Sequence, residues 1–202
     1  MRTISREAEI VTEIKRSRFI GRSFLQSTPD EALALIIKLR QAERDATHHC
    51  WAYRLGREGE QARYSDDGEP RGTAGPPILE VLKKNDVTNV VLVVTRYYGG
   101  IKLGTGGLAR AYGDAAKRVL EESRLKDLRL TADIEAAVPY PLLGALENYL
   151  AGEGGEITGK TFGEFVRVRL RLPADREADF EEYYARLTAG KSSLTVLGRD
   201  YR

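Results

Sequence analysis

The stretch Thr95-Arg-Tyr-Tyr-Gly-Gly-Ile-Lys-Leu-Gly-Thr-Gly-Gly-Leu-Ala-Arg-Ala-Tyr-Gly113 decides how this chain folds. It follows the continuously apolar run Val90–Val94, which predicts a buried strand, and it leads into a segment with apolar residues at helical spacing. Six of its positions are glycine, and Arg96, Lys102 and Arg110 lie among them. Such clustering of glycine indicates positive φ angles or a backbone that passes very close to another group.

A second unusual segment lies upstream, at Ser65-Asp-Asp-Gly-Glu-Pro-Arg-Gly-Thr-Ala-Gly-Pro-Pro77. It concentrates three carboxylates, Asp66, Asp67 and Glu69, as the later segment concentrates cations. Opposite charges attract across a cleft. We therefore expect this acidic loop and the glycine loop, residues 99–107, to face each other across one cleft.

The composition indicates a chain without membrane-spanning segments. Hydrophobic residues make up 42% of the 202 residues, and Val90–Val94, the longest apolar run, is far too short to cross a bilayer. The N-terminus lacks the apolar region of a secretory signal, and Cys50 is the only cysteine, so no intrachain disulfide can form. We expect a cytoplasmic protein with no membrane partner.

The formal net charge is only +2, so nucleic-acid binding is not indicated by the overall charge and would rest on local patches. Lys15, Arg16, Arg18 and Arg22, in and beside a short basic turn, could form one such patch as a basic edge for nucleic-acid phosphates. A turn whose charges simply face solvent is the alternative interpretation of these residues.

The first part of the chain mixes strands and helices. Thr28 at the N-cap position, Pro29 at the first helical position and Glu31 closing a capping box predict a helix. The other expected elements are strands at Ala8–Ile14, Arg18–Leu25, His48–Leu55 and Thr88–Thr95, a helix at Ile78–Lys84, and a helix that begins in the glycines.

From Leu128 onward the pattern becomes strand, helix, strand, strand, helix, strand, which is the order of a ferredoxin-like module. The expected segments are Leu128–Val138, Pro141–Leu150, Glu156–Thr161, Glu164–Leu172, Asp175–Leu187 and Ser193–Gly198. The sequence thus predicts an α+β protein with an N-terminal domain at residues 1–127 and a smaller ferredoxin-like domain at residues 128–202.

The glycine loop predicts an anion site. A glycine-rich loop that opens a helix presents free backbone N–H groups and the positive end of the helix dipole. The candidate residues for anion or nucleic-acid binding are Gly104, Gly106, Gly107, Arg96, Lys102 and Arg110, together with Arg16 and Arg18. The alternative is a tight strand-to-helix connection in which the glycines only relieve crowding.

The acidic loop allows two interpretations. Asp66, Asp67 and Glu69 could hold Mg²⁺ through carboxylate oxygens beside a phosphate pocket. Asp-Gly and Glu-Pro are also ordinary turn chemistry, so a solvated turn is the other interpretation of these residues. The nearby run from His48 to Cys50 places only these two end residues on one strand face, which is too few ligands for zinc, and a buried thiol is the expected state of the cysteine.

Three ordered motifs, Ala46–Arg54 (ATHHCWAYR), Tyr64–Gly75 (YSDDGEPRGTAG) and Thr95–Gly113, together resemble the IMPACT family in its bacterial YigZ-like form. The resemblance implies an N-terminal domain like the second domain of ribosomal protein S5, a fold shared with elongation factor G domain IV and GHMP-type kinases. It also implies a C-terminal module similar to elongation factor G domain V. The run from Lys102 to Leu108 looks like the GHMP phosphate loop, but Ala109-Arg-Ala111 replaces its serine-rich tail.

Eukaryotic members of the family regulate translation by competing for an activator of an initiation-factor kinase, so the resemblance implies a role near translation. We expect association with RNA or the ribosome through phosphate groups at the glycine loop, and a translation-related protein as a further partner. A Mg²⁺-dependent enzyme acting on a phosphorylated small molecule is the rival hypothesis, and a pure protein-interaction module is the third. No cofactor other than Mg²⁺ is expected, and fold analogy alone does not decide whether the chain is an enzyme.

Overall fold

The computed structural model describes residues 1–201. The chain divides into two compact units, one ending at Asp127 and the other beginning at Leu128. Both units combine helices with β-sheet, so the predicted α+β class is confirmed. None of the helices in the described part of the chain combines the length and apolarity needed to span a membrane.

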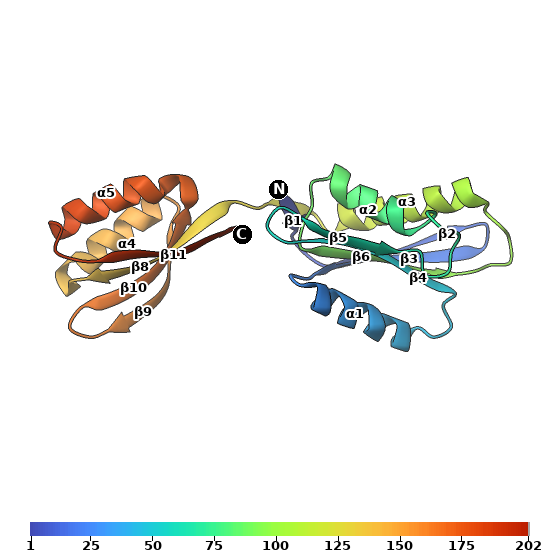
Figure 1. Cartoon of the computed structure of the whole chain (residues 1–202), viewed down its shortest axis with the longest axis horizontal. Coiled ribbons are helices and arrows are strands. Elements are labelled where there is room, and N and C mark those ends of the chain that lie inside the picture. The colour runs from blue at the N-terminus through green and yellow to red at the C-terminus, as the bar shows by residue number, and fades with distance from the viewer. Residues whose placement is uncertain (202) are drawn as a thin grey trace. The chain divides into compact units, whose positions relative to one another are not determined.

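The first unit is a five-stranded antiparallel sheet in the order β2-β3-β6-β4-β5, with α1 on one face and α2 and α3 on the other (Figure 1). Its strands are β2 (Ala8–Ile14), β3 (Ser17–Leu25), β4 (His48–Leu55), β5 (Gln61–Ser65) and β6 (Val90–Tyr97), and its helices are α1 (Pro29–Ala42), α2 (Gly75–Lys84) and α3 (Thr105–Glu122).

The central strand β6 explains the apolar run in the sequence, because helices cover both of its faces. Val90, Leu92 and Val94 pack in the core beneath α2 and α3. Val91 and Val93 belong to the core on the α1 side. Alternate residues of a strand point to opposite faces, so a strand covered on both sides has to be apolar throughout.

Three short strands were not anticipated from the sequence. Strand β1 (Arg2–Ile4) pairs antiparallel with β7 (Leu125–Asp127), which fastens the two ends of the first unit to each other. Strand β5 lies at the edge of the sheet and four of its five residues are exposed, so it carries no apolar alternation by which it could be recognised.

The second unit has the predicted ferredoxin-like connectivity, with a sheet in the order β11-β8-β10-β9. Its elements are β8 (Leu130–Val138), a 3-10 turn (Tyr140–Leu142), α4 (Leu143–Gly152), β9 (Glu156–Phe162), β10 (Val166–Pro173), a second 3-10 turn (Ala174–Arg176), α5 (Glu177–Thr188) and β11 (Leu194–Tyr201). Both helices pack on one face of the sheet around a core that includes Ile134, Leu146 and Phe180, and the other face is left open (Figure 1).

The start of α1 provides a test of how the local sequence stabilises this fold. The Thr28 hydroxyl accepts a hydrogen bond from the Glu31 N–H at 3.3 Å, and the Glu31 carboxylate accepts one from the Thr28 N–H at 3.2 Å. The predicted capping box is thus confirmed. We expect Thr28→Ala to lower the free energy of unfolding by about 1 kcal/mol, because one helix N–H loses its acceptor.

Urea denaturation measures this loss, with Ser27→Ala as the matched control. Ser27 contacts Glu31 through its backbone N–H, at 3.1 Å, so its hydroxyl can be removed without loss of the cap. Equal unfolding free energies for the Thr28 and Ser27 variants would contradict the capping role.

Candidate functional site

Several of the predicted site residues meet at one end of the five-stranded sheet, where β6 ends and β3 and β4 begin. Gly99, just after β6, passes so close to the β2–β3 turn that a Cβ on it would lie 2.0 Å from the carbonyl oxygen of Arg16. Only glycine permits this approach. The glycine loop and the basic turn are therefore held against each other.

The acidic loop reaches the same end of the sheet through a buried ion pair. Arg96 Nη1 donates to Glu69 Oε1 at 2.7 Å, and the Tyr112 hydroxyl donates to the same oxygen at 2.8 Å. The second guanidinium nitrogen of Arg96 lies 3.2 Å from the hydroxyl of Ser17. The network thus joins β6, α3, the start of β3 and the loop between β5 and α2.

The burial of Arg96 corrects one prediction. Its guanidinium lies over the rings of Phe19 and Tyr98, at 5.4 Å and 5.1 Å from their centroids, and only 4% of the residue is exposed. A cation committed to Glu69 in this way is not available for an external phosphate. Arg96 was predicted to contact an anion directly, because the sequence reveals the charge of this residue but not that Glu69 pairs with it.

The other two acidic residues also have protein partners. Asp66 accepts hydrogen bonds from the backbone N–H groups of Gly72, Ala74 and Gly75 at 2.8–2.9 Å, so it caps the start of α2. Asp67 pairs with Arg40. Both carboxylates are therefore engaged by other groups of the protein, Asp66 within the acidic loop and at the start of α2, and Asp67 on α1.

These three carboxylates do not form a metal centre in this structure. Among the described residues, no group of three or more His, Cys, Asp or Glu side chains is arranged to hold a metal ion. Asp66 and Asp67 point their oxygens at backbone N–H groups, including that of His49 at 2.6 Å from Asp67 Oδ2, and Glu69 is engaged by Arg96. The geometry therefore gives the predicted magnesium site no support.

The run from His48 to Cys50 has structural partners. His48 Nδ1 lies 2.8 Å from the carbonyl oxygen of Asp67, and because a carbonyl only accepts, this nitrogen donates. Burial lowers the pKa of His49. Burial also raises the pKa of the Cys50 thiol, which donates to the carbonyl of Asp66 at 3.0 Å. A protonated, buried thiol is a poor nucleophile, which agrees with the expected hydrophobic role of this cysteine.

The exposed part of the site is a hollow of about 380 Å³ at the start of α3. It is bounded by the β2–β3 turn, the glycine loop and the first turns of the helix, and its lining residues are Ile14, Lys15, Leu103, Gly107, Arg110, Ala111 and Asp114. The acidic loop contributes none of these. Glu69 of the acidic loop instead bonds to Arg96, three residues before the glycine loop, and the open hollow lies against the β2–β3 turn, so a cleft between the two loops stays a prediction.

The start of α3 leaves backbone N–H groups available. Gly104 occupies the N-cap with a φ of 75°, a conformation that favours glycine, and no side chain caps the helix. The first intrahelical bond runs from the N–H of Leu108 to the carbonyl of Gly104 at 2.9 Å. The N–H groups of Gly106 and Gly107 precede it, and the first turn contains no acidic residue. These are the features on which the predicted anion site depends, and anion binding itself stays a prediction.

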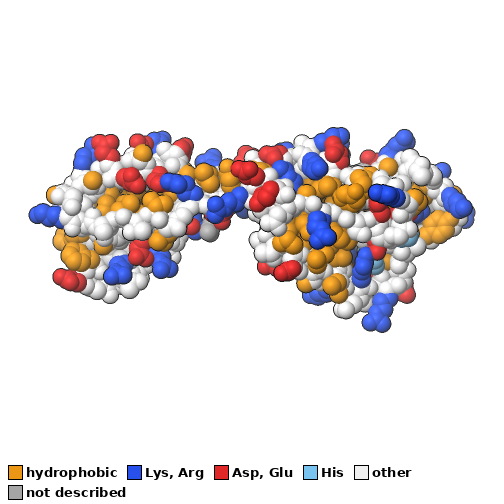
Figure 2. Space-filling view, viewed as in Figure 1, with side chains coloured by type: hydrophobic (Ala, Val, Ile, Leu, Met, Phe, Trp, Pro, Cys, Tyr) orange, Lys and Arg blue, Asp and Glu red, His pale blue; other side chains and the backbone are white. Residues whose placement is uncertain are grey.

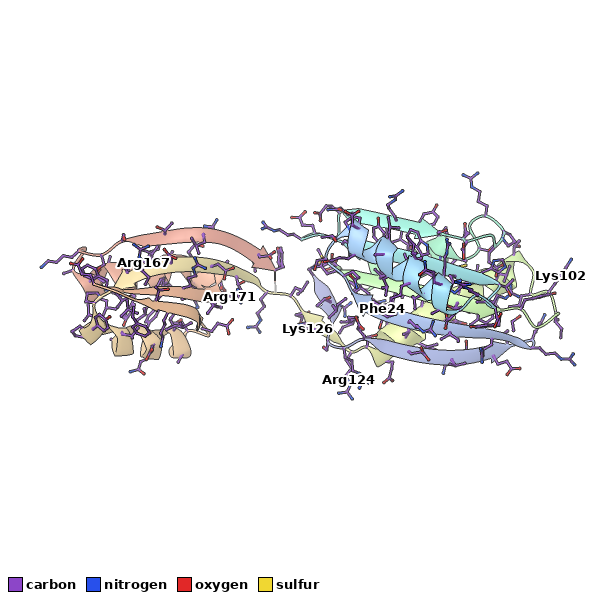
Figure 3. The ribbon with its side chains drawn as sticks, turned by 90° about the horizontal axis from the view of Figure 1, so that it is seen from below. Phe24, Lys102, Arg124, Lys126, Arg167 and Arg171 are labelled. Carbon is purple, nitrogen blue, oxygen red and sulfur yellow. The ribbon has the colours of Figure 1, made fainter. Side chains whose placement is uncertain are left out.

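The predicted cations are distributed unevenly around this hollow. Arg110 lines it, and Lys102 is exposed on the glycine loop two residues before the N-cap (Figure 3). Arg16 is exposed in the neighbouring turn, and Arg18 lies over the ring of Tyr97, at 4.4 Å from its centroid.

Lys15, which the sequence placed in the candidate basic edge for nucleic-acid phosphates but not at the anion site of the glycine loop, also lines the hollow. Lys15 and Arg16 have φ values of 47° and 65°, which is unusual for residues other than glycine, asparagine and aspartate. The short basic turn was the available signal, but the sequence did not show which of its cations faces the helix.

Comparison with known proteins agrees with this architecture. The Impact N-terminal domain matches residues 15–120, and a domain of unknown function, DUF1949, matches residues 137–191. The chain belongs to the IMPACT family. The family predicted from the three sequence motifs is thereby confirmed, and in this IMPACT protein every residue that lines the hollow, except Ile14, lies within the matched N-terminal domain.

Bacterial relatives extend over most of the chain. It is 39% identical to the IMPACT family member YvyE of Bacillus subtilis, covering 93% of this chain and 86% of the relative. It is 36% identical to the IMPACT family member YigZ of Escherichia coli, covering 93% of both. A crystal structure titled as that of a hypothetical protein is 34% identical, with a TM-score of 0.65, and the match covers 98% of this chain and 97% of that one.

The pair of Glu69 and Arg96 makes a testable contribution to stability. We expect Glu69→Ala to lower the free energy of unfolding by about 3–5 kcal/mol, because the guanidinium of Arg96 would remain buried without a counterion. Urea denaturation measures the change. Lys102→Ala is the matched control, and as an exposed residue it should alter stability by less than about 0.5 kcal/mol.

Replacing both partners tests the cause of the loss. The double variant Glu69→Met with Arg96→Met should be more stable than Glu69→Ala, since it leaves no unpaired charge in the core. A Glu69→Ala variant as stable as the parent would show that the pair does not hold the site together.

Proposed function

We propose that this protein binds RNA, free or within the ribosome, and thereby acts on translation, with RNA phosphates held at the start of α3. The observation that carries the proposal is the hollow lined by Gly107, in the uncapped first turn of α3, and by the cations Lys15 and Arg110. Free N–H groups and two flanking cations are the combination by which proteins hold phosphate oxygens.

The charges around the hollow support an anion rather than a cation as the ligand. Asp114 is the one carboxylate among the residues that line it, and it lies more than two turns into α3, beyond the reach of the helix-start N–H groups. Lys102 and Arg16 are exposed nearby and add positive charge. A helix dipole contributes about 0.3–1 kcal/mol to anion binding, so the side chains supply most of the attraction.

The family supports the link to translation. Protein IMPACT of mouse is 35% identical over 95 residues, which span 45% of this chain and 29% of the mouse protein. Regulation of translation by the eukaryotic members suggests a similar role here, in the cytoplasm and near a translation-related protein. Because the match covers less than a third of the mouse protein, the RNA contact is proposed from the hollow and not transferred from that relative.

RNA binding at several salt concentrations tests the proposal. We expect the logarithm of affinity for a single-stranded RNA to fall linearly with the logarithm of salt, because phosphate contacts release bound counterions. Lys15→Ala, Lys102→Ala and Arg110→Ala should each reduce the steepness of that line by about 0.7 or less. Lys38→Ala, an exposed change on α1 across the sheet from α3, should leave it unchanged.

The rival hypothesis predicts a different outcome. An enzyme for a phosphorylated small molecule would need Mg²⁺ and would lose turnover in Asp66→Asn or Asp67→Asn. Turnover of a phosphorylated metabolite with Mg²⁺, together with no RNA or ribosome binding at low salt, would overturn the translation proposal.

A further inference from the structure

Strand β2 forms one edge of the N-terminal sheet, and no further strand covers its outer side (Figure 1). It pairs with β3 over seven residues, Ala8–Ile14, without a shift in register. Within the described part of the chain, nothing outside the sheet hydrogen-bonds to the backbone of residues 9–14. Alternate N–H and C=O groups of an edge strand point away from the sheet, so β2 presents a row of unpaired backbone groups.

The other edge strands of the two larger sheets are better protected against the addition of a strand. The pairing of β9 and of β11 with their neighbours is interrupted by a shift in register, and β5 has only five residues. Bulges and short lengths are means by which proteins block a sheet edge. β2 has neither, and it contains no proline.

The charges on the face of β2 toward α1 follow an alternating pattern. On β3 two arginines flank an apolar residue, and across from them on β2 two glutamates flank another. The cross-strand pairs are Arg18 with Glu13, Ile20 with Val11, and Arg22 with Glu9. Val11 is 53% exposed, because the sheet ends there. The row that continues this pattern is two cations around an apolar residue, since opposite charges stabilise a pair of strands.

Glu13 is the carboxylate of this row that remains available to a partner. Arg22 donates to Glu9 at 2.5 Å, whereas no ion pair to Glu13 forms among the described residues. Arg18, across from Glu13, lies instead over the ring of Tyr97. An exposed carboxylate beside open backbone groups favours a positively charged strand.

A second copy of this chain does not fit the edge. If two β2 strands paired antiparallel about Val11, Glu9 of one copy would lie opposite Glu13 of the other, and like charges so placed destabilise a strand pair. RNA is disfavoured as well, because its phosphates would meet the same glutamates. Figure 2 shows Lys and Arg side chains interspersed with Asp and Glu on the face that it draws, so local charge pattern selects a partner here, not an overall positive field.

On its other face β2 borders a second hollow, the β2 groove, of about 500 Å³. One wall is β2 over residues 11–14, and the other is the flank of α3 that includes Ala111, Asp114 and Arg118. The Thr12 hydroxyl oxygen in this wall is buried and has no hydrogen-bond partner among the described residues. Side chains of an added strand alternate between the two faces of the sheet, so those that point toward α3 would enter this groove.

We propose that β2 binds an extended protein segment as a sixth strand of this sheet, with lysine or arginine opposite Glu13 and Glu9 and an apolar residue opposite Val11. Backbone hydrogen bonds supply affinity in such strand addition, and side chains at alternate positions supply selectivity. The β2 groove adjoins the hollow at the start of α3, but its ligand is a protein segment, so this site goes beyond the proposed function and does not rest on RNA binding.

Two labelled seven-residue peptides, added to the full-length protein, test this site. Both have threonine at the odd positions; the first has lysine, valine and lysine between them, and the second has glutamate, valine and glutamate. Fluorescence anisotropy measures affinity, and NMR measures hydrogen exchange of the backbone amides. We expect the lysine peptide to bind more tightly and to slow exchange in residues 9–14, with no change in Gln61–Ser65 of the opposite edge strand β5.

Glu13→Lys tests the charge pattern. We expect this variant to bind the lysine peptide about fivefold more weakly and the glutamate peptide about fivefold more tightly, because the cross-strand pair changes sign. The opposite direction of the two effects distinguishes charge recognition from a general loss of structure. Glu164→Lys makes the same change at an exposed position between β9 and β10 and should leave both affinities as in the parent.

The outcomes also separate the possible partners. Unchanged exchange in β2 at a saturating concentration of the lysine peptide, or equal affinity for the two peptides, would overturn the proposal. Slower exchange in β2 on addition of a 12-nucleotide oligouridine, with no effect of the lysine peptide, would overturn it in favour of RNA. Protection of β2 that rises with protein concentration in the absence of peptide would overturn it in favour of a second copy. The peptide measurements contain no RNA, so their result is independent of the site at the start of α3.

Discussion

The ion pair between Arg96 and Glu69 is the contact on which the arrangement of the N-terminal site depends. It joins the end of the central strand to the acidic loop, and Tyr112 adds α3 by donating to the same carboxylate oxygen. Removing two charges from water is costly, and a buried pair repays that cost only with good geometry and further hydrogen bonds. Ser17 and the rings of Phe19 and Tyr98 complete the surroundings of the guanidinium.

The charged residues of the site fall into two groups: those that are paired within the protein, as Arg96 and Glu69 are, and those that remain exposed to a ligand. Glu69, Asp66 and Asp67 hold the acidic loop and the start of α2 in place through hydrogen bonds within the protein. The glycine loop differs from the acidic loop, because its conformation depends on glycines rather than on carboxylates. Gly99 lets it cross the β2–β3 turn, and Gly104 begins α3 without a capping side chain. One loop is tied down by its own carboxylates, while the other leaves backbone N–H groups exposed.

The sequence predicted helices and strands well where their apolar periodicity is strong. It predicted the N-terminal site less well. The apolar run of β6 and the cap of α1 were predictable because each depends on residues close in the chain. The roles of Arg96 and Lys15 were not predictable from the sequence. Arg96 pairs with Glu69, which lies 27 residues away in the chain. Lys15 lies in a turn that packs against the distant glycine loop. Charge is visible in a sequence, but whether a charge is already paired is not.

Pairing of charge also explains how a chain of net charge +2 can present sites for an anion. Most of its charge is compensated locally, as Arg169 is by Glu135 on the C-terminal sheet. Attraction is therefore confined to places where the compensation stops, such as Arg167 beside Ala137 and Lys15 beside the start of α3. A few such positions give weak long-range attraction, so selectivity has to come from short-range contacts.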